Sequence, residues 1–219
     1  MIKNWWWKIL GLVFILYSVI AGSLVDVPHL PVIYQTIRNL FYHVPMWFTM
    51  FTMFGTSLYY SIRYLNKLSL KDDVSASQSV NIGLFFGLLG LLTGMIWAKF
   101  TWGDFWTNDP QLNGAAVSIL AYLAYSILRA SIEEKFIRAR VSAVYNIFAF
   151  MLLVIFLGIL PRLADSSLHP GKGGNSSAMT DLDPSMRLIF YPAVIGWIIV
   201  SFWFLDLMKR KRKLELTLQ

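Results

Sequence analysis

Residues 141–161 read VSAVYNIFAFMLLVIFLGILP, and this stretch decides the fold because none of its 21 positions is charged. A helix needs about 20 apolar residues to cross the roughly 30 Å hydrocarbon core of a bilayer. Uncharged, mostly apolar windows of similar length lie at residues 9–25, 39–62, 74–98, 110–128 and 188–205. The pattern therefore predicts six membrane-spanning helices.

The composition excludes the common soluble classes. Of the 219 residues, 57% are hydrophobic and only 14% are charged, whereas a soluble domain usually carries about 25% charged residues. A disordered chain, a coiled coil and an ordinary soluble core are all poor interpretations. We expect an all-α polytopic membrane protein in which residues 1–219 form a single six-helix domain.

The basic residues are distributed unevenly between the two sides that six spans define. The N-terminal segment, residues 63–73, residues 129–140 and the C-terminal tail hold 14 of the 19 Lys and Arg residues. Because short basic loops stay in the cytoplasm, both termini are predicted inside and three loops outside. The run Lys209–Lys213 is then interpreted as a cytoplasmic stop, in preference to a site for nucleic acid or anionic lipid.

A cleavable signal peptide is the alternative for the first window, since Ala21-Gly22-Ser23 resembles a small-residue cleavage site. Its apolar stretch exceeds the usual length of about 7–15 residues, and Trp5-Trp6-Trp7 suits an interfacial anchor. We therefore expect a retained helix.

Two helix starts can be predicted from acidic residues that precede proline. In Asp109-Pro110 and Asp183-Pro184 the carboxylate can cap a helix whose first residue is proline. Pro45 and Pro192 fall within apolar windows. Pro45 either belongs to a first helical turn or kinks its helix.

The chain has no cysteine and three histidines, His29, His43 and His169. Thiolate metal sites, CxxC pairs and covalent haem attachment are therefore excluded. The predicted topology places all three histidines outside or at the outer boundary. Two converging imidazoles could bind a transition metal or both axial positions of a haem. The alternative is an ordinary role: His29 is more simply interpreted as a loop histidine, His169 could be solvated, and His43 could form a hydrogen bond at the interface.

Large aromatic residues crowd the second predicted outer loop, residues 99–109, beside Asp109. They are Trp97, Trp102, Phe105 and Trp106. An interfacial aromatic belt is the simplest interpretation, and a flat apolar platform for a planar macrocycle is the alternative. The propionates of a haem would need positive partners, for which Lys99, Arg162, Lys172 and Arg187 are available on the outer side.

The sequence WGDFWTNDPQLN, residues 102–113, resembles the tryptophan-rich WWD signature WGxxWxWDxRLT of the haem-handling cytochrome c biogenesis family. Tyr42-His43-Val44-Pro45 resembles the HVP element of that family, and His169 corresponds to its second flanking histidine. Positions 105, 108, 111 and 113 depart from the signature. Six spans within about 220 residues are similar to a small member of the family.

The resemblance implies that the protein binds haem b on the outer face, with His43 and His169 as axial ligands. It implies delivery of that haem to a membrane-tethered periplasmic chaperone, beside ABC transporter subunits and a small single-span protein. The location implied is the plasma (inner) membrane of a bacterium, or an organelle of bacterial origin. The role is haem handling and transfer, with no enzymatic turnover and no nucleic-acid partner.

Three other functions remain as alternatives. A haem ligase or synthase-type relative, and a b-type electron-transfer cytochrome, would both typically carry histidines inside the spans, and none lies deep within the windows here. A transporter or channel would need a polar path across the bilayer, for which no ionisable residue marks a route. Haem handling is the function we expect.

Overall fold

The computed structural model describes residues 5–28, 33, 35–169 and 182–217, and every regular element among them is helical. The predicted all-α class is therefore confirmed for this part of the chain. The elements follow in the order α1 (Trp6–Leu24), η2 (Gln35–Asn39), α2 (Leu40–Lys67), α3 (Leu70–Trp102), α4 (Pro110–Ala130), α5 (Lys135–Leu153), η3 (Val154–Ile159), α6 (Leu160–Leu163) and α7 (Pro184–Thr217).

Five helical stretches are long and apolar enough to cross a membrane. They are Trp6–Leu24, Leu70–Trp102, Pro110–Ala130, Lys135–Leu163 and Pro184–Glu215. The second predicted window corresponds to α2, which has 28 residues but a lower hydropathy. A polytopic membrane protein is thus supported, whereas the sixth span remains a prediction.

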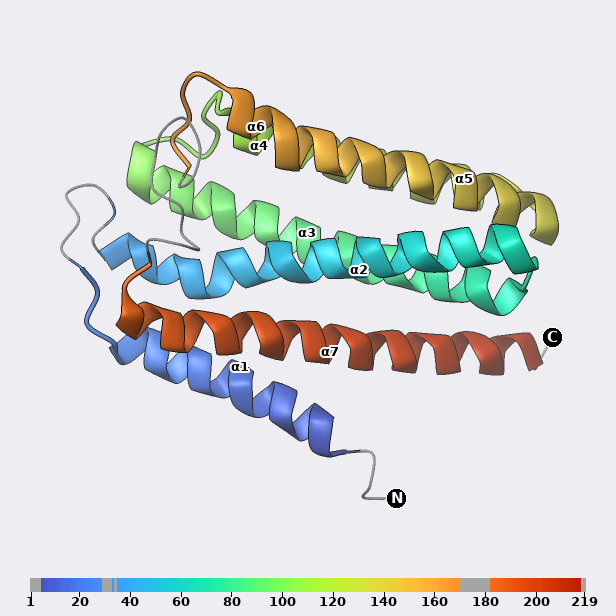
Figure 1. Ribbon diagram of the computed structural model, residues 1–219, viewed down its shortest axis with the longest axis horizontal. Coiled ribbons are helices and arrows are strands. Elements are labelled where there is room, and N and C mark those ends of the chain that lie inside the picture. The colour runs from blue at the N-terminus through green and yellow to red at the C-terminus, as the bar shows by residue number, and fades with distance from the viewer. Residues whose placement is uncertain (1–4, 29–32, 34, 170–181, 218–219) are drawn as a thin grey trace.

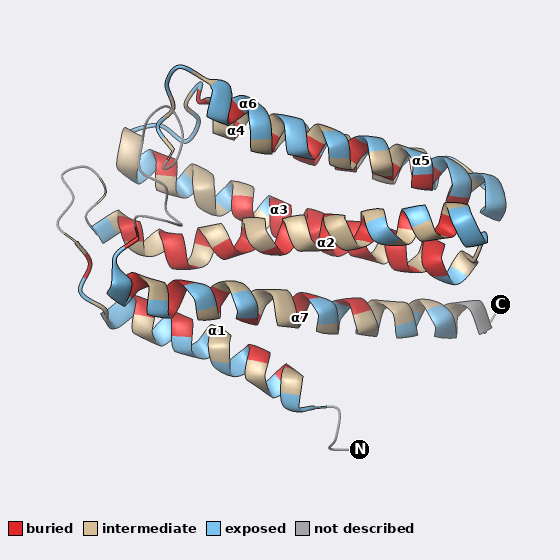
Figure 2. Cartoon of the chain, in the orientation of Figure 1, coloured by how far each residue is buried: buried red, intermediate tan, exposed pale blue. Residues whose placement is uncertain are grey.

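The polar content of α2 is explained by its position. It contacts α3, α5 and α7, and Figure 2 shows buried residues along most of its length, more than on α1. Thr49 and Ser57 of α2 are fully buried. A helix that meets protein on several sides needs less lipid-compatible surface than a peripheral helix, so polar residues are tolerated there.

The helices form an elongated bundle with two distinct ends (Figure 1). We call loop end the end where α1, α3 and α6 finish and where α2, α4 and α7 begin. We call terminal end the opposite one, where α7 finishes and where α2 and α4 are joined to the helices that follow them. This alternation is compatible with the predicted topology, and which side of a membrane each end faces remains a prediction.

Both predicted helix starts are confirmed. The Asp109 carboxylate accepts a hydrogen bond from the Gln111 amide at 2.8 Å, and α4 begins at Pro110. The Asp183 carboxylate accepts one from the Ser185 amide at 2.8 Å, before α7. Pro45 lies inside α2, beyond its first turn.

Several helices run past the apolar windows. α3 continues through Lys99 to Trp102 and ends at Gly103, whose φ of 92° is left-handed, so the predicted outer loop 99–109 is shorter than expected. α7 continues to Thr217, so the basic run is helical. A charged residue marks the point at which the chain leaves the hydrocarbon core, and the apolar window stops there. The helix itself can continue beyond that point.

The fifth predicted span is interrupted near the loop end. η3 is a π-helical segment, and it lies between α5 and α6, just before Pro161. Proline lacks the N–H that would continue the α-helical ladder, which favours such an irregularity. Gly114 of α4 packs against the carbonyl of Phe156, and a Cβ at this position would overlap it. The lack of a side chain thus brings α4 close to this segment.

Polar pairs stabilise the interior toward the terminal end. Arg129 binds Asp73 through two hydrogen bonds of 2.7 Å each. The Asn146 amide donates to the hydroxyls of Ser57 and Ser61 at 2.6 and 2.8 Å. Buried polar groups need partners of this kind, because an unpaired group would cost free energy.

Candidate functional site

His43 lies in the first turn of α2, at the loop end, and is only 8% exposed. Its Nδ1 is 3.1 Å from the Thr93 hydroxyl of α3. That hydroxyl donates to the Leu89 carbonyl at 2.8 Å, so it accepts from His43. The indole N–H of Trp47 donates to His43 Nε2 at 3.1 Å. His43 is therefore assigned as the neutral tautomer that carries its proton on Nδ1.

Two glycines of α3 make room for this pair of side chains. A Cβ on Gly94 would lie 2.7 Å from His43 Cε1, and a Cβ on Gly90 would lie 2.9 Å from Trp47 Cε2. Real Cβ atoms do not approach so closely, so only glycine permits this packing. Trp97 follows Gly94 on α3, and its ring meets the imidazole edge-on at a centroid distance of 5.7 Å.

His169 is held by the cap of α4. Its Nδ1 lies 2.8 Å from an oxygen of Asp109, and Trp102 packs edge-on against its ring at 5.1 Å. The other oxygen of Asp109 accepts from the Ser167 hydroxyl at 2.8 Å and from the Leu168 amide at 2.7 Å. One buried carboxylate thus orients the imidazole and the segment that carries it.

Burial alone would raise the pKa of the Asp109 carboxyl. The hydrogen bonds from His169, Leu168 and Ser167 outweigh this effect and hold its pKa well below the ordinary value. Asp109 therefore remains an anion. An anionic acceptor beside Nδ1 of His169 keeps the proton of the imidazole on Nδ1, so Nε2 is the nitrogen that can bind a metal. The negative charge also makes Nε2 more electron-donating.

The structure brings His43 and His169 to the same end of the bundle although 126 positions separate them. His43 donates through Nδ1 to the Thr93 hydroxyl, and His169 donates through Nδ1 to the Asp109 carboxylate. Each imidazole also has a tryptophan of α3 packed against its ring. This shared arrangement is compatible with two Nε2 ligands.

The four predicted aromatic residues are divided between two environments. Trp97 and Trp102 belong to α3, where each contacts one of the two histidines. Phe105 and Trp106 lie in the following loop and are 53% and 41% exposed. The Trp106 indole donates to the Asn113 side chain at 3.2 Å. The aromatic set therefore combines a half-buried part near the histidines with an exposed part.

The predicted cationic partners are engaged with the protein backbone. Arg162 donates to the Gly158 carbonyl, Arg187 donates to the Leu182 carbonyl at 2.6 Å, and Lys99 donates to the Gly103 carbonyl at 2.6 Å. Lys172 and His29 lie outside the described residues. The geometry does not select one of these cations for a propionate.

Sequence reasoning missed the supporting residues on α2 and α3. They are Trp47, Gly90, Thr93 and Gly94. Their signal was present as spacing, because Trp47 follows His43 by four positions and Gly90, Thr93, Gly94 and Trp97 follow one another at helical intervals of three, one and three. Recognising it requires knowing that α2 packs against α3.

The donor set fits a haem better than a bare metal ion. Among the residues that the structure describes, no three His, Asp or Glu side chains converge. A haem iron needs only one or two protein ligands, because the porphyrin supplies the others. Near the histidines, the indole N–H of Trp97 and the side-chain oxygens of Thr107 and Gln111 are buried without a partner. Such groups can receive a polar ligand.

Comparisons with known proteins point the same way. The sequence profile of the family Heme exporter protein C matches residues 2–217. Heme exporter protein C of Bradyrhizobium diazoefficiens is 32% identical over 113 residues, which cover 51% of this chain and 43% of that protein. The protein of the same name from Paracoccus denitrificans is 28% identical over 99 residues, 45% of this chain and 41% of the relative.

Cytochrome c biogenesis protein CcsA of Atropa belladonna is 24% identical over 159 residues, which cover 69% of this chain and 49% of the relative. The chain therefore spans less than half the length of each of these three relatives.

Proposed function

Since the chain belongs to the Heme exporter protein C family, we propose that it binds haem b at the loop end and delivers it during cytochrome c maturation. The iron is held between Nε2 of His43 and Nε2 of His169. The observation that carries this proposal is the matched pair of imidazoles, each fixed through Nδ1 and each packed against a tryptophan of α3.

The two ligands differ in strength. His169 donates to the anionic Asp109, which increases the electron donation from its Nε2. His43 donates to the neutral hydroxyl of Thr93, and its Nε2 lone pair is shared with the Trp47 N–H. Iron must displace that N–H to bind. The bond to His43 is therefore the weaker one and the first to exchange during delivery.

The aromatic residues complete the site. Trp97 and Trp102 cover the porphyrin near the ligands, while the exposed rings of Phe105 and Trp106 face the acceptor of the haem. Asp109 acts as the positioning residue for His169. Arg162, Lys172 and Arg187 remain the cationic candidates for the propionates.

The acceptor that we propose is a membrane-tethered periplasmic haem chaperone. The protein works beside ABC transporter subunits and a small single-span protein, in the inner membrane of a bacterium or an organelle of bacterial origin, with the loop end outside. Its role is positioning and ligand exchange, which require no enzymatic turnover.

A second candidate is a haem ligase or synthase-type activity. The similarity to the CcsA proteins favours it. A ligase would form covalent haem on an apocytochrome without the chaperone, whereas a delivery protein would need the chaperone. Mixing the haem-loaded protein with an apocytochrome peptide, with and without the chaperone, separates the two functions.

The test of the site is an absorbance spectrum of the protein purified in mild detergent. We expect a low-spin haem signature that is lost in His43→Ala and His169→Ala, with partial recovery on addition of imidazole. His29→Ala is the matched control and should retain the signature. Unchanged spectra in both axial variants would refute the assignment, and haem loss in His29→Ala would show that the pair was chosen wrongly.

A further inference from the structure

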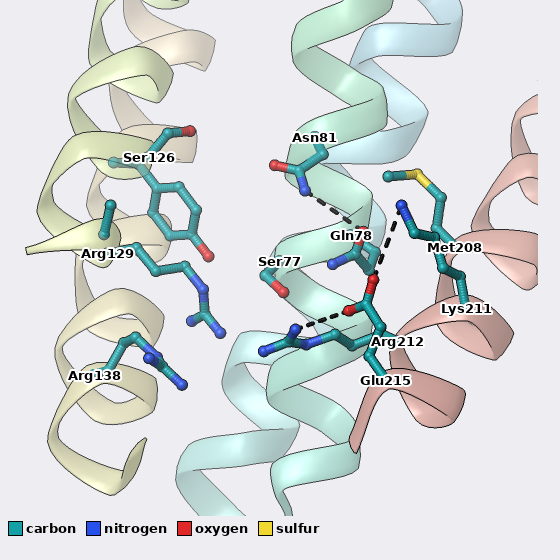
Figure 3. Close-up of a pocket in the computed structure, with 12 residues that line it drawn as sticks. Ser77, Gln78, Asn81, Ser126, Arg129, Arg138, Met208, Lys211, Arg212 and Glu215 are labelled. Carbon is teal, nitrogen blue, oxygen red and sulfur yellow. Dashed lines mark hydrogen bonds and ion pairs between the residues drawn. The ribbon is translucent and has the colours of Figure 1, made fainter. Parts of the chain in front are cut away.

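A cationic cavity lies at the terminal end, far along the bundle from the histidines. Its volume is about 460 Å³, and α3, α4, α5 and α7 contribute its walls (Figure 3). Four basic residues line it, Arg129, Arg138, Lys211 and Arg212, together with a single carboxylate, Glu215. The lining therefore has an excess of positive charge.

The contacts of these groups preserve that excess. Arg129 is neutralised by Asp73, which binds it through both oxygens. Lys211 and Arg212 both approach Glu215, at 3.9 and 2.9 Å, so one carboxylate faces two cations. Arg138 of α5 donates a long hydrogen bond of 3.5 Å to the backbone carbonyl of Ile132. The cavity is thus suited to an anion.

The wall that α3 provides changes character along the helix. Gln78 and Asn81 line the cavity. Phe85, Leu88 and Leu92 continue the same helical face toward the middle of the bundle, because the spacings are four, three and four residues. These three apolar side chains are 52%, 41% and 57% exposed. A polar recess is therefore continuous with an apolar strip.

We propose that this cavity binds the phosphate headgroup of an anionic phospholipid, whose acyl chains lie along the apolar strip of α3. A free phosphate has the same headgroup chemistry but would leave that strip uncovered. Basic recesses between membrane helices on the cytoplasmic side are known to suit such headgroups, and this end is the one predicted to face the cytoplasm. The basic tail then contributes to a lipid site in addition to marking topology.

The test uses the full chain in nanodiscs of phosphatidylcholine, with and without phosphatidylglycerol, analysed by native mass spectrometry and by thermal unfolding. We expect retained phosphatidylglycerol and a higher Tm in its presence. Arg138→Gln and Arg212→Gln should each weaken retention about five-fold, since one basic residue near an anionic surface contributes roughly that factor. Leu88→Ser should weaken retention as well.

Arg210→Gln is the matched control. Arg210 lies on the same helix, pairs with Asp206 at 2.8 Å and is absent from the cavity lining, so its replacement removes the same charge from the tail. It should change retention less than two-fold. Equal losses in Arg210→Gln and Arg212→Gln would indicate diffuse surface charge and overturn the proposal.

Two other results would also overturn it. If inorganic phosphate in neutral nanodiscs raises Tm as much as the lipid does, the cavity is an ion site. If the mass spectrum shows a dimer without bound lipid, a second copy covers this face. The haem spectrum reports the loop end separately, so failure of the lipid site can be distinguished from failure of the proposed function.

Discussion

Replacing Trp47 with phenylalanine should strengthen haem binding, although it removes an aromatic N–H beside a proposed ligand. In the ligand-free protein the Trp47 N–H occupies the lone pair of His43 Nε2 at 3.1 Å. His43 is 8% exposed, so in Trp47→Phe this acceptor is left largely unsatisfied until iron binds it. An unsatisfied buried acceptor costs about 1–3 kcal/mol, which corresponds to an increase in affinity of about five-fold or more.

The assay is an absorbance titration of the ligand-free protein with haem in detergent. Trp97→Phe is the control, because the ring of Trp97 meets the same imidazole at 5.7 Å and 77°, compared with 6.0 Å and 77° for Trp47. The Trp97 N–H is buried without a partner, so its removal frees no lone pair on the histidine. A loss of affinity in Trp47→Phe, or a gain of equal size in both variants, would refute the reasoning.

Three further predictions concern the support of the site and the bundle. Gly94→Ala should abolish low-spin haem, because its Cβ would lie 2.7 Å from an atom of the α2 imidazole, whereas Gly55→Ala, whose Cβ would meet nothing nearer than 3.9 Å, should keep the spectrum. Asp109→Asn should lower haem affinity and Tm together, since an amide cannot accept from every donor around that carboxylate; a variant with unchanged haem titration would argue against a positioning role. Asp73→Asn should lower the free energy of unfolding by about 2 kcal/mol, because it removes the counter-ion of the partly buried Arg129, and an unchanged denaturant midpoint would contradict this.

The sequence predicted the helical class and the helix starts because both depend on local chemistry. An uncharged stretch of membrane-spanning length and an acidic residue before proline act through their immediate neighbours. The lengths of the helices were not predictable in the same way. α3 extends to Trp102 past Lys99, because a lysine at the boundary interrupts an apolar window without interrupting the backbone ladder.

The missed part of the candidate site depends on the pairing of two helices. Glycine is required at position 94 because His43 packs against it, and at position 90 because Trp47 packs against it. A glycine within an apolar helix is otherwise compatible with many kinds of close packing. The register between α2 and α3 is a tertiary property, so the sequence of either helix alone could not supply it.

Asp109 shows why a structural role and a functional role need not be alternatives. On sequence alone, Asp109-Pro110 could be explained by helix capping without any function. In the structure one oxygen accepts both from the Gln111 amide and from His169, at 2.8 Å each, so the atom that starts α4 also orients the imidazole. The second oxygen holds Leu168. Because the Asp109 carboxylate lies at the start of α4, its hydrogen bond holds His169 in a fixed position relative to the bundle, although His169 belongs to a connecting segment.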